Sequence, residues 1–199
     1  MPVKIFSVPC ASSPTLTCIP QAGTSTQLDS LGDRLMFRLA YRNFGTHESL
    51  VVNHSVKTSV APAGVRWYEI RNPNGGTPTV FQQGTLTDSG TSLWMGSIAM
   101  DKVGDVALGF SESSSSIHPK IAFTGRMPND PAGTMEGITT IFSGAGSQTG
   151  GITRWGDYTA MAIDPSNECT FWYVNEYIPS NGSFNFHTRL ASFEFSSCI

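Results

Sequence analysis

The chain has 199 residues, which is enough for one domain with a substantial hydrophobic core. Only 14% of the residues are charged and 39% are hydrophobic, and the 20 glycines and 12 prolines are typical of strands joined by turns. The net charge of -3 argues against general affinity for nucleic acid, and no apolar run is long enough to span a membrane.

A threefold internal repeat organises the predicted strands. The first strand of each copy ends in Asn or Asp at a turn and covers residues 35–43, 93–101 and 156–164. A second apolar strand follows at residues 49–55, 106–112 and 169–176, and a third, with a cation near its start, at residues 65–71, 119–126 and 188–193. No segment shows sustained helical periodicity, so the sequence predicts an all-β protein.

A fourth strand is marked by a triplet of an apolar residue, a phenylalanine and a polar residue, at 80–82 and 141–143. The third copy lacks this triplet, but residues 5–7 near the N-terminus carry it. Four-stranded units whose last member is completed from the other end of the chain are typical of β-propellers. We therefore predict a single domain over residues 1–199, with an N-terminal strand and loop (1–30) and three blades (31–90, 91–150 and 151–199).

Propellers close with about four to eight blades, so three would leave two open apolar faces. One interpretation is that the chain is the last half of a longer propeller. The other is that two copies close a six-bladed ring, in which each lends its N-terminal strand to the third blade of its partner. An isologous dimer would cover both open faces and both free strand edges, and we therefore expect a homodimer.

Four cysteines favour an oxidising compartment, although three pairings are possible. Cys10 and Cys18 bracket a loop rich in Ser and Pro, whereas Cys169 opens a strand and Cys198 lies beside the C-terminus, so these two pairs would each fix a terminal segment. The alternative is four buried free thiols. We expect disulfides and a secreted or cell-surface protein, although the start Met-Pro-Val-Lys is not a signal peptide.

Two long stretches resemble a known group of proteins. Leu-Gly-Asp-Arg-Leu-Met-Phe-Arg-Leu-Ala-Tyr-Arg-Asn-Phe (31–44) and Arg-Trp-Gly-Asp-Tyr-Thr-Ala-Met-Ala-Ile-Asp-Pro (154–165) are similar to the C-terminal region of large secreted bacterial proteins that are propeller-like. The resemblance covers nearly the whole chain and implies a fold and export, but no activity. A more distant similarity is to sialidase-type propellers, through the Asp-x-x-Gly turn at 101–105, which here follows a first strand and lacks the Thr-Trp that follows it in that family.

The candidate binding residues lie where the innermost strands begin, because strand ends and adjoining loops form the usual binding face of a propeller. They are Asp33, Arg34, Arg154, Trp155, Asp157 and Tyr158. A guanidinium can hold a carboxylate or sugar hydroxyls through paired hydrogen bonds, and these residue types together favour a carbohydrate ligand. The alternative is that the arginines and aspartates form ion pairs that support the scaffold.

The candidate catalytic residues are Asp157, Tyr158 and Glu176, because carboxylates serve as acid, base or nucleophile in glycoside hydrolysis. Asp157 is the first candidate for a functional role, since its equivalents in the other copies, Met36 and Trp94, are apolar. A position that is polar in only one copy is more readily explained by function than by the scaffold.

One further repeat position carries His54, Glu112 and Glu176. These side chains could converge on a divalent cation such as calcium. The favoured alternative is that each pairs with the cation of its own third strand, which is Arg66, Lys120 or Arg189. The scattered histidines show no zinc-ligand spacing.

Three functions remain open at this stage. The favoured one is an exported module that binds or hydrolyses carbohydrate, as a lectin-like protein or a glycosidase. The second is a non-catalytic interaction or assembly domain of a larger surface protein. The third is a metal-dependent hydrolase with an ion in the central channel. No P-loop, nucleophile elbow or dinucleotide-binding motif is present in the sequence.

Overall fold

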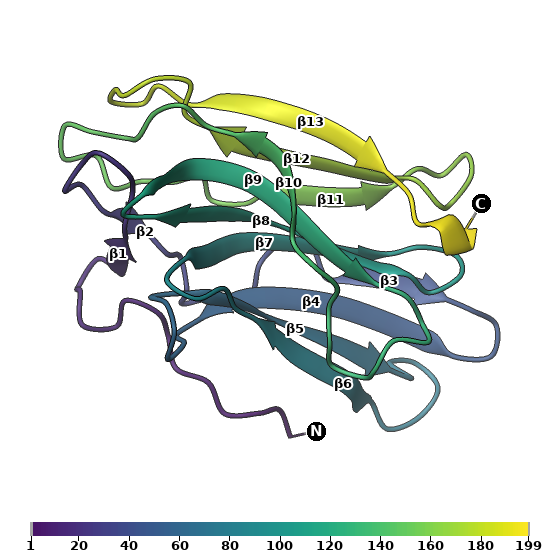
Figure 1. Ribbon diagram of the computed structural model, residues 1–199. Coiled ribbons are helices and arrows are strands. Elements are labelled where there is room, and N and C mark those ends of the chain that lie inside the picture. Colours follow the sequence, from purple (N-terminus) through teal and green to yellow (C-terminus); the bar gives the residue numbers. More distant parts are fainter. Residues whose placement is uncertain (1, 199) are drawn as a thin grey trace.

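The computed structural model describes residues 2–198 as strands, turns and one short 3-10 helix at Ser196–Cys198 (Figure 1). The all-β prediction is confirmed, and every pairing between named strands is antiparallel. Within these residues no helix is long and apolar enough to cross a membrane.

Three sheets follow one another along the chain, after a small ribbon of β1 (Thr17–Ile19) and β2 (Leu28–Asp29). The first sheet contains β3 (Ala40–Asn43), β4 (Glu48–Val56), β5 (Gly64–Arg71) and β6 (Thr79–Leu86). The second contains β7 (Ser92–Met100), β8 (Val106–Ser114), β9 (Ile117–Arg126) and β10 (Thr139–Ser143). The third contains β11 (Ala160–Ile163), β12 (Phe171–Tyr177) and β13 (His187–Phe193), and neighbours in each sheet are neighbours in sequence.

The sheets lie face to face, with the second between the other two (Figure 1). Every residue of β7 and β8 is buried, because both faces of the second sheet are covered. Val65 and Trp67 of the first sheet pack against one face, and Phe171 and Tyr173 of the third belong to the cluster on the other. Two such layers of buried apolar and aromatic side chains supply the main stabilisation of the fold.

The two outer faces of the stack differ. On the first sheet, the N-terminal segment crosses the outer face, where the Phe6 ring lies 4.5 Å from the His54 ring and the Lys57 N–H donates to the Ser7 carbonyl at 2.8 Å. On the third sheet, Trp172 and Leu190 are 39% and 60% exposed. One end of the stack is therefore covered by the chain itself and the other is open.

The N-terminal triplet is not where the repeat predicts it. Residues 5–7 form no strand and lie on the first sheet, where the apolar outer face offers the Phe6 ring an edge-to-face contact with His54. The third sheet keeps three strands, and the sheets described by residues 2–198 form an open stack without a closed ring. The first strand of the first copy is also shorter than predicted and begins at Ala40.

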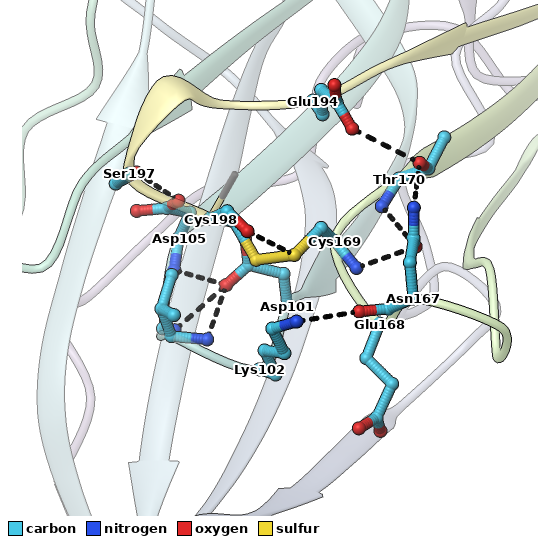
Figure 2. Close-up of a disulfide and its surroundings, with 12 residues drawn as sticks. Asp101, Lys102, Asp105, Asn167, Glu168, Cys169, Thr170, Glu194, Ser197 and Cys198 are labelled. Carbon is cyan, nitrogen blue, oxygen red and sulfur yellow. Dashed lines mark hydrogen bonds between the residues drawn. A yellow bond between two sulfur atoms is a disulfide. The ribbon is translucent and has the colours of Figure 1, made fainter.

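Both expected disulfides are present. Cys10 pairs with Cys18, and Cys169 pairs with Cys198 (Figure 2). The second joins the turn before β12 to the C-terminal segment across 29 residues of sequence. Disulfides of this kind stabilise a fold by about 2–4 kcal/mol each, and they indicate an oxidising, extracellular environment.

Candidate functional site

The loops that lead into β3 and β11 meet, and they bring several predicted binding residues together. Arg34 donates through Nε and Nη2 to both carboxylate oxygens of Asp33, at 2.8 and 2.9 Å. The Asp33 carboxylate raises the pKa of the Arg34 guanidinium, and hydrogen bonding with the Tyr158 hydroxyl adds to this. Tyr158 comes from the second loop, and its ring contacts Phe37 of the first, so the two loops are in contact.

A second ion pair lies on the same loop as Tyr158. Arg154 donates through Nη2 to the Asp157 carboxylate, and both side chains are more than half exposed. Exposed ion pairs of this kind contribute about 0–1 kcal/mol to stability. Hydroxyl or carboxylate groups of a ligand could therefore replace either partner at small cost to the fold.

Two exposed aromatic rings, one from each loop, are in contact. Tyr158 is half exposed, and its ring meets the Phe37 ring edge to face, with 6.2 Å between centroids. We call the set of Asp33, Arg34, Phe37, Arg154, Asp157 and Tyr158 the loop surface. It combines rings that can stack on a ligand with charged groups that can hydrogen-bond to it.

Glu176 lies beside this surface, at the end of β12. Its Oε1 accepts a hydrogen bond from the Gly156 N–H at 2.8 Å. Burial raises the pKa of the Glu176 carboxyl; the Gly156 N–H and Arg154 lower it, and the charge of Asp157 raises it. A cavity of about 170 Å³, lined in part by Tyr158 and Glu176, opens here. The structure thus brings the candidate carboxylates Asp157 and Glu176 within electrostatic range of each other.

Trp155 belongs to the core more than to the loop surface. Its side chain is buried, its indole N–H donates to the Ser111 hydroxyl at 3.0 Å, and its ring packs against Trp94. It also lines the cavity beside Glu176. Any contact with a ligand is therefore restricted to the cavity wall.

The repeat position shared by His54, Glu112 and Glu176 does not form one site. Glu112 pairs with Lys120 at 2.9 Å, as the ion-pair alternative predicts. His54 instead accepts or donates through Nε2 to the Tyr68 hydroxyl at 3.0 Å, and burial, assisted by the charge of Arg66, lowers its pKa to about 4.

Glu176 does not meet its predicted partner Arg189. In the strand pairing Glu176 lies opposite Thr188, so Arg189 points to the other face, where its guanidinium lies 4.7 Å from the Phe142 ring centre. Among the described residues, no three acidic, histidine or cysteine side chains are grouped so that they could hold a metal ion.

Of the two rings of the loop surface, Tyr158 was a candidate from the sequence and Phe37 was not. Four alternate apolar side chains before and within β3 face solvent, and they are Leu35, Phe37, Leu39 and Tyr41. The alternation is visible in the sequence, but it was assigned to a strand with a buried face. Nothing in a period of two says which face is buried, so Phe37 was not recognised as a neighbour of Tyr158.

No protein-family model matches the chain, and no curated protein or solved structure matches it either. The functional interpretation therefore depends on the geometry of the loop surface and the cavity beside it.

Proposed function

We propose that this protein binds extracellular carbohydrate at the loop surface. The observation that carries the proposal is the contact between the exposed Tyr158 and Phe37 rings, each of which lies on a loop that also carries an exposed Arg–Asp pair. An aromatic ring offers an apolar face to the C–H groups of a sugar, while guanidinium and carboxylate groups exchange hydrogen bonds with its hydroxyls. The two disulfides support a secreted or cell-surface location for such a module.

A hydrolytic form of this proposal assigns roles to the two carboxylates. Glu176, whose pKa is raised by burial, would be the general acid, and the exposed Asp157 would be the base or nucleophile. Two carboxyl groups in different environments are what retaining and inverting glycosidases both need. Tyr158 would position the sugar beside them.

The test compares two tyrosines with matched exposure. Tyr158 is 50% exposed on the loop surface, and Tyr41 is 49% exposed, where its hydroxyl donates to Glu48. We expect Tyr158→Ala to weaken binding of an oligosaccharide, identified from a panel of neutral and acidic glycans, by at least about 10-fold. Tyr41→Ala should bind like the wild type. Equal affinity for all three proteins, or no binding by the wild type, would remove the proposal.

An assembly module is the second candidate, and the open outer face of the third sheet favours it. Trp172 and Leu190 are exposed there, and β13 has a free edge. In this view the three sheets are blades, and a second copy completes a six-bladed propeller by covering the open face of the third sheet.

A further inference from the structure

Two fully buried carboxyl groups lie together in the turn between β7 and β8 (Figure 2). Asp101 and Asp105 both have 0% exposure. Asp101 Oδ1 accepts hydrogen bonds from the N–H groups of Val103, Gly104 and Asp105, at 3.0, 2.9 and 2.9 Å. Asp101 Oδ2 and Asp105 Oδ1, however, have no hydrogen-bond donor among the described residues.

The cations packed nearby have other partners. From the same turn, Lys102 donates to the Asn167 carbonyl, and from β3, Arg42 donates to the Met100 carbonyl and pairs with Glu168. From β9, Arg126 donates to the carbonyls of Thr134 and Asp130. The remaining acidic neighbour, Glu194, contacts Thr170. Within residues 2–198 neither Asp101 nor Asp105 forms an ion pair.

Two buried carboxylates without a cation are costly, because each loses its hydration and the two repel each other. We propose that Asp101 and Asp105 share one proton, and that this proton fastens the C-terminal segment to the second sheet. A proton between Asp101 Oδ2 and Asp105 Oδ1 gives both unpartnered oxygens a hydrogen bond and removes one of the two buried charges. Burial, together with the charge of Asp105, also raises the pKa of Asp101 to about 6.

The pair reaches the C-terminal segment through Ser197, whose hydroxyl donates to Asp105 Oδ2. The next residue, Cys198, is disulfide-bonded to Cys169 of the third sheet. Phe195 packs edge to face on Phe171 of β12, and a Cβ at Gly125 of β9 would overlap its ring. Residues 194–198 therefore bridge the second and third sheets, and the carboxyl pair is their polar attachment to the second.

The direction of the pH effect follows from the pKa of Asp101. Its folded value of about 6 lies above its ordinary value of 3.8, so between these values the folded protein binds more protons than the unfolded chain. The stabilisation is fully present below the ordinary pKa and is lost as the pH rises through about 6. At pH 8 the shared proton is lost, and repulsion within the carboxyl pair should displace Asp105 and loosen the Ser197 contact while the disulfide keeps the segment tethered.

Hydrogen exchange of the C-terminal segment tests this directly. The Cys198 N–H donates to the Phe195 carbonyl at 3.1 Å, and its protection from exchange reports whether the C-terminal segment is attached to the second sheet. After correction for the intrinsic pH dependence of exchange, we expect its protection in the wild type to fall at least about 10-fold from pH 5 to pH 8. In Asp105→Asn the neutral amide can donate to Asp101 Oδ2 at every pH, so protection should be nearly constant.

Two further measurements keep the result decisive. Ser197→Ala removes the contact but not the carboxyl pair, so protection should be low at both pH values. If Asp105→Asn does not fold, carbon NMR titration of the Asp101 and Asp105 carboxyl groups in the wild type replaces it. We expect the carboxyl chemical shifts to show one titration step near pH 6, at which the shared proton is lost. The shared proton would be overturned by wild-type protection that does not change with pH, or by two carboxyl titration steps that both lie below about pH 5. It would also be overturned if added Ca²⁺ restored the protection at pH 8.

Discussion

At the scale of single residues, the role proposed for Glu176 and the stability of the fold make opposite demands. A half-buried carboxyl whose pKa is raised by burial favours the folded state while it is protonated and disfavours it once it is ionised. The Gly156 N–H and Arg154 compensate only in part. A carboxyl whose ionised form is disfavoured holds its proton to higher pH, which is the property that the proposed general acid would require.

We therefore expect Glu176→Gln to be more stable than the wild type above pH 5 and about equally stable at pH 4. The stabilisation that Glu176 provides is present below its ordinary pKa of 4.5 and is lost as the pH rises through its raised folded value. Gln retains an oxygen that can accept the Gly156 N–H. Urea unfolding at pH 4 and pH 8 measures the difference, which should grow with pH. A variant less stable than the wild type at pH 8 would show that Arg154 outweighs burial.

At the scale of elements, the spacing of the sheets depends on glycine in the second sheet. Gly109 of β8 faces Tyr173 of β12, and a Cβ at this position would overlap the Tyr173 ring. The Tyr173 hydroxyl in turn bonds to Thr159 and Asn175. The absence of a side chain at Gly109 thus leaves room for a buried polar network between the second and third sheets.

Gly109→Ala should therefore destabilise the protein by about 1–3 kcal/mol, the usual cost of overpacking a core. Gly137→Ala is the matched control, because no atom lies within 4 Å of the position its Cβ would take. Thermal or urea unfolding of both variants measures the contrast. If the two variants were equally stable, the sheets would be free to move apart, and close packing of β8 on β12 would be refuted.

Much of the element pattern could be predicted from sequence, because strands such as β8 and β12 are apolar runs bounded by turns such as 101–105 and 164–168. For segments at the edges of the sheets, the sequence did not predict which face is buried or which part of the fold the segment contacts. Residues 35–39 alternate like a strand but lie outside one, and Phe6 belongs to a segment that resembles the repeat triplet but contacts His54 on the first sheet. The contact between Phe37 and Tyr158 joins two loops more than 100 residues apart in sequence, and no local pattern reports such a contact.

At the scale of the whole molecule, the open outer face of the third sheet is a surface on which a second copy could pack. Both faces of the second sheet are covered by its neighbours, and every residue of β7 and β8 is buried. The third sheet exposes Trp172 and Leu190 and a free strand edge at β13. Apolar faces and unpaired edges of this kind favour association.

We expect light scattering to give a mass near twice 21.4 kDa under non-reducing conditions. Leu190→Lys places a charge on the open face and should yield the monomer, because burying an unpaired ammonium in an interface costs more than a single apolar contact contributes. Val103→Lys changes a residue that is 41% exposed on the turn between β7 and β8, and it should leave the mass unchanged. A wild-type monomer would contradict the proposed six-bladed ring. A dimer insensitive to Leu190→Lys would place the interface elsewhere, with the exposed apolar stripe before β3 as the next surface to change.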